Sequence, residues 1–156
     1  MKKLALPLAL LLAFAGCASS SPPDNTAVPG HGAVSIEVIP NPIVATQVSG
    51  NTYDFPFEVV IRETGGRPVT VQRVTATVVY GGGLPLGSES WDANRIRSMG
   101  YNTTLAANSE VRYRFAPRKE VPDDRLFGGV SAELRVDAID DTGAAAYAAT
   151  SVTVRK

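Results

Sequence analysis

The stretch Val130–Ala138 reads VSAELRVDA, and its apolar and polar side chains alternate with a period of two. Valine, alanine and leucine take every second position, and serine, glutamate, arginine and aspartate fill the positions between them. This period is typical of a β-strand, because successive side chains point to opposite faces of a sheet. The stretch therefore predicts a strand with one dry face and one wet face.

Five further runs show the same alternation or the same richness in valine and threonine; they cover residues 34–38, 55–61, 69–80, 111–115 and 150–154. Turn-forming residues separate the runs, for example Pro40, Pro42, Thr64–Pro68 and Asp140–Gly143. Proline interrupts a strand because it cannot donate to the ladder, and glycine and aspartate favour turns. About seven strands are expected, and they predict an all-β, antiparallel sandwich over residues 34–156. A β-barrel or a jelly roll would fit the same alternation.

Three stretches of this domain, Ile39–Pro42, Leu105–Ser109 and Leu134–Gly143, are similar to immunoglobulin-like or fibronectin-type-III-like domains of bacterial envelope proteins. The resemblance implies an immunoglobulin-like β-sandwich. The Cys, Trp and Cys arrangement of antibody domains is missing, so the resemblance concerns the architecture and transfers no binding site.

The N-terminus has the layout of a secretory signal peptide. Met1–Lys3 carries positive charge, Leu4–Ala15 is apolar, and small residues follow. About a dozen apolar residues are too few for a comfortable membrane span, which needs roughly 20. We therefore expect residues 1–16 to be a signal helix that is cleaved off.

Ala15–Cys17 ends in the only cysteine of the chain and resembles the lipobox of bacterial lipoproteins. The resemblance implies cleavage before Cys17, a diacylglyceryl group on its sulfur and acylation of the new amino terminus. Ala18 follows, where Asp would be the familiar signal for inner-membrane retention in Gram-negative bacteria. The expected location is thus the cell envelope, lipid-anchored at Cys17, and in a Gram-negative cell the outer membrane facing the periplasm.

Residues 17–33 are expected to form the lipidated N-terminus and a flexible tether, because serine, proline and glycine dominate and apolar periodicity is absent. His31, the only histidine, falls in this tether and is interpreted as a solvated linker residue. A site built from several histidines and a Ser-His-Asp triad are therefore both excluded from the folded part.

Composition narrows the partners further. Without Lys2 and Lys3 the chain has 13 basic and 15 acidic side chains, so it lacks the basic footprint of a nucleic-acid-binding protein. No cysteine remains for a disulfide. No metal or other cofactor is expected.

The segment Leu84–Asn102 is the least strand-like part and is expected to contain a helical turn. Trp91, Arg95, Arg97 and Tyr101 form a tentative binding loop there, because Trp, Tyr and Arg dominate the energetics of interfaces. The alternative interpretation is that Trp91 covers the open end of the core.

Asp137, Asp140 and Asp141 offer oxygen ligands that calcium would accept, with Asp123 and Asp124 available from another loop. The favoured interpretation is a hairpin turn, in which aspartate bonds the backbone and glycine adopts positive φ.

The resulting hypothesis is a membrane-anchored envelope lipoprotein with a non-catalytic β-sandwich for interaction or structural support. Its partners would be the membrane and another envelope protein or a glycan. The alternatives are a small-ligand or carbohydrate-binding module that uses the loop of Trp91 and Tyr101, and a hydrolase that uses paired carboxylates, for which no pair stands out.

Overall fold

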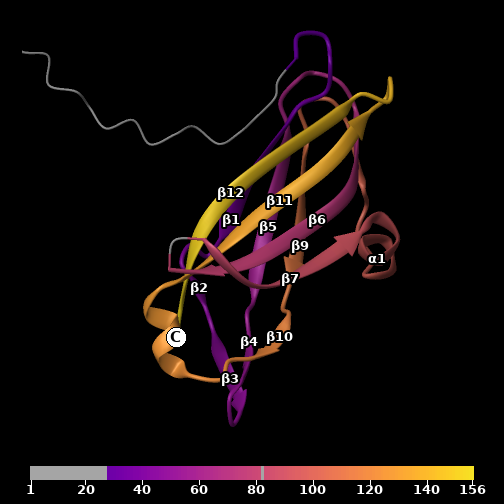
Figure 1. Ribbon diagram of the computed structural model, residues 1–156. Coiled ribbons are helices and arrows are strands. Elements are labelled where there is room, and N and C mark those ends of the chain that lie inside the picture. The colour runs from indigo at the N-terminus through magenta and orange to yellow at the C-terminus, as the bar shows by residue number, and fades with distance from the viewer. Residues whose placement is uncertain (1–27, 82) are drawn as a thin grey trace, which may run out of the picture.

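The computed structural model describes residues 28–81 and 83–156. Figure 1 shows two layers of long strands, and the predicted all-β antiparallel sandwich is confirmed. The expected signal peptide of residues 1–16 and the anchor at Cys17 lie outside the described residues. In the described part, no helix has the length and apolar character needed to cross a membrane.

The first layer is an antiparallel sheet with the order β1-β5-β9. Its strands are β1 (Val34–Ile39), β5 (Phe57–Glu63) and β9 (Glu110–Phe115).

The second layer has the order β2-β12-β11-β6-β7, and β8 also pairs with β6. Its strands are β2 (Ile43–Val44), β12 (Ala145–Arg155), β11 (Val130–Asp140), β6 (Val69–Tyr80), β7 (Leu84–Asp92) and β8 (Thr104–Leu105). All its pairings are antiparallel except that of β2 with β12.

A small third sheet lies at the end of the sandwich near the C-terminus (Figure 1). It consists of β3 (Thr46–Ser49), β4 (Thr52–Asp54) and β10 (Arg118–Glu120). Two short helices complete the described elements: α1 (Ala93–Ser98) and the 3₁₀ helix η1 (Asp124–Gly128). Asp92 caps α1 by accepting a hydrogen bond of 2.8 Å from the Arg95 N–H, and this is the helical turn that the sequence predicted.

The core forms where the two layers face each other. Val59 and Ile61 of β5 meet Leu134 and Val136 of β11 within one apolar cluster, and all four are 0% exposed. The alternation in Val130–Ala138 thus has its expected cause, since its apolar side chains are buried, Val130 only in part, and its charged ones face outward.

Ion pairs cover the outer face of the first sheet. Glu58 accepts from Arg112 at 2.9 Å and from Arg114 at 2.8 Å, and Arg62 bridges to two more glutamates of the neighbouring strands. Val60 lies between these pairs and is 0% exposed. Long arginine stems can bury an apolar side chain in this way while their charged ends stay in water.

β7 is the main departure from the sequence-based expectation. It occupies half of the segment predicted to be least strand-like, and it lies at one edge of the second sheet, where it pairs only with β6 among the described strands. Most of its side chains are exposed on both faces, so it carries no apolar alternation to recognise. The strands β2, β3, β4, β8 and β10 have two to four residues each, too few for a period of two to show.

Candidate functional site

Trp91 lies in the core. Its side chain is on the inner face of β7 and the residue is 3% exposed. The indole stacks on Phe115 with ring centroids 4.1 Å apart, and Phe57 contacts it edge-on at 6.2 Å. The structure therefore agrees with the alternative interpretation, in which Trp91 covers the core. At 3% exposure its ring is not accessible to a partner.

The other three residues of the tentative binding loop make contacts within the fold. Arg95 donates to the Glu89 carboxylate and to the Ser90 carbonyl O, both at 3.0 Å, and its guanidinium lies over the Trp91 ring. Arg97 donates to Asn94 and to Thr103. The Tyr101 hydroxyl accepts from the Arg114 N–H at 3.2 Å. These three side chains are thus held by contacts within the fold.

The three aspartates considered for calcium are directed to different partners. Asp137 accepts from Arg135 at 2.9 Å, and Asp141 accepts from Arg67 at 2.8 Å. Asp140 belongs to a hairpin turn between β11 and β12 in which Gly143 has a φ of 85°. Across residues 28–81 and 83–156, no group of three His, Cys, Asp or Glu side chains is arranged to hold a metal ion.

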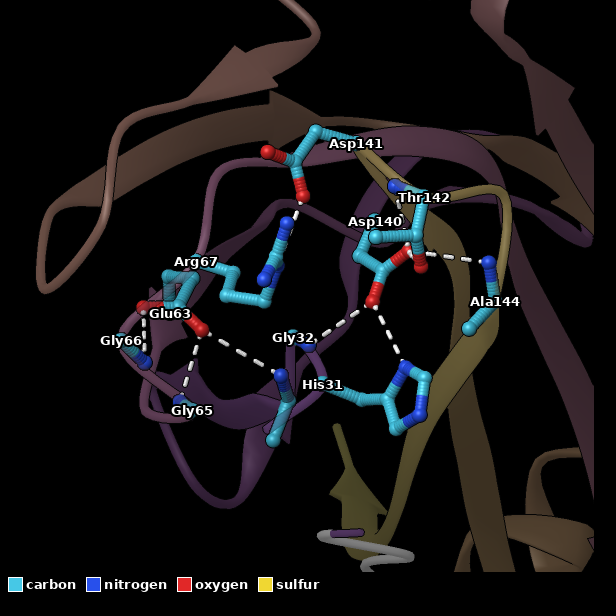
Figure 2. Close-up of polar contacts among 11 residues, drawn as sticks. His31, Gly32, Glu63, Gly65, Gly66, Arg67, Asp140, Asp141, Thr142 and Ala144 are labelled. Atoms are coloured by element: carbon cyan, nitrogen blue, oxygen red, sulfur yellow. Dashed lines mark hydrogen bonds and ion pairs between the residues drawn. The ribbon is translucent and has the colours of Figure 1, made fainter. Parts of the chain in front are cut away.

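Asp140 is one of two buried carboxylates at this end of the sandwich (Figure 2), and it is 4% exposed. Its Oδ1 accepts from the Thr142 hydroxyl at 2.6 Å and from the N–H groups of Thr142 and Ala144. Its Oδ2 accepts from the Gly32 N–H at 3.1 Å and lies 3.2 Å from His31 Nδ1. The hydrogen bond from the Thr142 hydroxyl, helped by the backbone donors, holds the pKa of Asp140 well below its usual range despite burial.

Glu63, at the end of β5, is the second buried carboxylate and is 3% exposed. Its oxygens accept hydrogen bonds from four backbone N–H groups: those of Gly65 at 2.7 Å, Asn108 at 2.8 Å, Gly66 at 3.0 Å and Ala33 at 3.2 Å. Burial is the largest single influence and raises the pKa of Glu63, but the four donors together hold it below its ordinary value. One charged side chain therefore joins three separate segments of the chain.

These two carboxylates fasten His31–Ala33 to the domain. His31, expected to be a solvated linker residue, instead contacts Asp140, and Ala33 is 1% exposed. The approach is close, since a Cβ on Gly65 would collide with the His31 carbonyl O and lie 2.6 Å from the Ala33 N. Serine, proline and glycine content does not reveal such docking, because the contacts come from residues 30 to 109 positions away.

One recess of the described residues is an apolar pocket of about 480 Å³. It lies at the opposite end of the sandwich, where η1, β10 and the C-terminus gather (Figure 1). Its apolar walls come from both layers and from η1, and they include Phe55, Phe57, Leu126, Phe127, Leu134 and Val154.

The pocket exists because β7 lacks large apolar side chains on part of its inner face. Gly87, Glu89 and Trp91 share that face, and only Trp91 fills it. A Cβ added to Gly87 would meet no atom within 4 Å. Opposite them on β6 and β11, Ala76 and Ala132 also leave space. The glycine four positions and the glutamate two positions before Trp91 were the available signal, but this signal has meaning only once the segment is recognised as a strand.

Charged groups from two sheets meet at the mouth of this pocket. Lys119 of β10 donates to Glu89 of β7 at 2.6 Å, and Arg95 binds the other oxygen of the same carboxylate at 3.0 Å. The Lys119 ammonium lowers the pKa of Glu89 most, and the Arg95 guanidinium lowers it further. Burial acts in the opposite direction but does not outweigh the two cations. Chemically, this arrangement can hold an apolar group inside and a polar group at the rim.

No family model matches the chain, and no curated protein does. Among solved structures, it is similar to the X-ray structure of Northeast Structural Genomics Consortium target SoR45, with a TM-score of 0.53 and 11% identity over 82% of this chain and 90% of that chain. A putative ApaA protein from Bordetella pertussis gives a TM-score of 0.52 and 15% identity, over 81% of this chain and 95% of that chain. A CARDB domain from Pyrococcus furiosus, solved with di-metal ions, gives a TM-score of 0.39 and 13% identity, over 81% of this chain and 90% of that chain. The first two likenesses concern the fold alone.

Proposed function

We propose that this chain is a membrane-anchored lipoprotein of the bacterial envelope whose β-sandwich is a non-catalytic binding domain. The observation that carries the proposal is the apolar pocket of about 480 Å³, which lies in the size range of small-molecule sites and is walled mainly by hydrocarbon. The loop of Trp91 and Tyr101 is not favoured as the site, because the Trp91 ring belongs to the core.

The docking of His31–Ala33 supports this proposal by fixing the end at which the N-terminal segment joins the domain. The chain enters beside the turns that follow β5 and β11, and the pocket lies at the far end (Figures 1 and 2). Leu134 in the pocket and Asp140 at the docked end are on one strand, roughly 20 Å apart at the rise of a β-strand. An anchor at Cys17, which covalent geometry keeps within about 40 Å of Val28, would attach the chain at the end of the domain remote from the pocket.

The anchor is tested by labelling cells with radioactive palmitate. We expect the wild-type chain to be labelled and to sediment with membranes, because the thiol at Cys17 is the attachment point. Cys17→Ser should lose the label, whereas Ser19→Ala, two residues further on, should keep it. Equal labelling of wild type and Cys17→Ser would remove the anchor from the proposal.

The pocket is tested with a neutral photoreactive hydrocarbon, adamantyl diazirine, applied to the full chain in nanodiscs. Label should concentrate on the walls near Gly87 and Leu126, because these line the cavity. Gly87→Phe should lower that labelling about tenfold, since a ring at an open inner-face position would occupy a cavity of ordinary ligand size.

Leu84→Phe is the matched control for the pocket. It places the same ring on the same strand, at a residue that is 62% exposed and does not line the cavity. Label that is scattered over the surface, or equal in the two variants, would contradict a binding role for the pocket.

A further inference from the structure

The interior of the pocket calls for a hydrocarbon ligand. Every buried side-chain nitrogen or oxygen of the described residues already has a hydrogen-bond partner, so the core around the pocket contains no unpaired polar side-chain atom. Aromatic and aliphatic side chains from both layers form most of the lining. A polar group placed inside would lose its water without compensation, and an apolar chain would not.

The size of the pocket suits a chain rather than a single ring. A methylene group is about as large as a water molecule, whose share of the liquid is roughly 30 Å³. On that scale the cavity of about 480 Å³ has room for roughly sixteen methylenes. This matches the inner part of one long acyl chain.

The mouth supplies a cation that a ligand can take. Glu89 holds two cations, Lys119 at 2.6 Å and Arg95 at 3.0 Å. If Lys119 turns to a ligand anion, Arg95 still neutralises Glu89, so the exchange leaves no carboxylate unpaired. Arg95 itself is fixed by the Ser90 carbonyl O and the Trp91 ring, which leaves Lys119 as the cation free to exchange.

Glu120 also lines the mouth and opposes an anion, but it is exposed to solvent, where salt and water screen its charge. Glu89, in contrast, lies on the inner face of β7 with its side chain 23% exposed. The charge pattern at the rim thus favours a single anionic group beside Lys119.

We infer that the pocket binds a free long-chain fatty acid, with the acyl chain between the two layers and the carboxylate at Lys119. This inference rests on the proposed binding function of the pocket and names its ligand class.

The test uses two photoreactive probes with the same diazirine-bearing sixteen-carbon chain, one a carboxylic acid and the other the corresponding alcohol. Each is added to the full chain in nanodiscs and the labelled residues are mapped by mass spectrometry. The acid should label the pocket more strongly than the alcohol. Lys119→Met should weaken labelling by the acid about fivefold, as the loss of a partly exposed ion pair implies, and leave the alcohol unchanged.

Glu89→Gln should change labelling by the acid in the opposite direction to Lys119→Met. It therefore separates a role of Lys119 in binding the ligand from a role in holding the mouth together. It removes the carboxylate that competes for Lys119, so labelling by the acid should rise. Variants that merely loosen the mouth would change labelling by the acid and the alcohol alike.

A photoreactive phosphatidylcholine in the nanodisc distinguishes the source of the chain. We expect it to leave the pocket unlabelled; strong labelling there would overturn the free fatty acid as ligand. Equal labelling by acid and alcohol, unaffected by Lys119→Met, would overturn the carboxylate contact. In both cases loss of the adamantyl label in Gly87→Phe would still uphold the pocket as a binding site, and its persistence would defeat both proposals.

Discussion

Replacing Glu63 with alanine is expected to lower the free energy of unfolding by about 3 to 5 kcal/mol, because hydrogen bonds to a charged group contribute about 1.5 to 3 kcal/mol each and are not additive. The four N–H groups that donate hydrogen bonds to Glu63 belong to the docked segment, the turn after β5 and the loop before β9. The alanine variant would leave these N–H groups without their acceptor, at a site where Glu63 is only 3% exposed. Urea unfolding at pH 7, followed by circular dichroism, measures the difference.

The same carboxylate makes the effect depend on pH. Glu63 has a lower pKa in the folded chain than its ordinary value of 4.5, so it binds fewer protons when folded. Its contribution to stability is therefore complete above about pH 4.5 and is lost as the pH falls through the folded pKa. The gap between wild type and Glu63→Ala should narrow in acid, because only the wild type has this carboxylate to protonate.

Glu37→Ala is the control for Glu63. Its side chain is 52% exposed and makes one ion pair with Arg62, so we expect a loss of no more than about 1 kcal/mol. A loss for Glu63→Ala as small as that of Glu37→Ala, or a gap that stays constant down to pH 3, would show that the four hydrogen bonds do not hold the three segments together.

The features that could be predicted from the sequence are those for which a single strand or turn contains the cause. Val130–Ala138 alternates because β11 is central, with one face in the core, and Asp140–Gly143 contains the side chain and the glycine that its turn requires. These are local properties, which spacing alone reveals. Element type and the sandwich architecture followed from them.

The features that could not be predicted from the sequence depend on distant residues. β7 lies at the edge of its sheet, and its inner positions include Gly87 and Glu89, so its composition resembles that of a loop. The pocket is created by those positions together with residues of β6, β10, β11 and η1. His31 and Ala33 appeared to belong to a tether because their partners, Asp140 and Glu63, are 109 and 30 positions away.

The two ends of the sandwich differ in a way that suits an anchored binding domain. The end that receives the N-terminal segment is closed by buried, fully hydrogen-bonded carboxylates. The other end is open and apolar, with its ion pairs confined to the rim. The N-terminal segment joins the domain at one end and the recess lies at the other, so an anchored chain would carry its ligand site at the end remote from the attachment.

Trp91→Ala tests which of the two roles considered for this residue is correct. The indole is stacked on Phe115 and touches Phe57, and 3% of the residue is exposed, so truncation removes a large apolar side chain from the core. We expect the free energy of unfolding to fall by about 3 to 5 kcal/mol, the usual cost of such a cavity. Circular dichroism is the suitable signal, because the variant lacks the only tryptophan of the chain.

Leu84→Ala, on the same strand but 62% exposed, separates the loss of packing from a general weakness of β7. Its effect should stay within about 0.5 kcal/mol, as for most surface substitutions. Trp91→Phe should lie between the two, because a smaller ring can keep part of the contact with Phe115. If Trp91→Ala were as stable as Leu84→Ala, the indole would be dispensable to the core and available to a partner, and the loop around it would have to be considered again as the binding site.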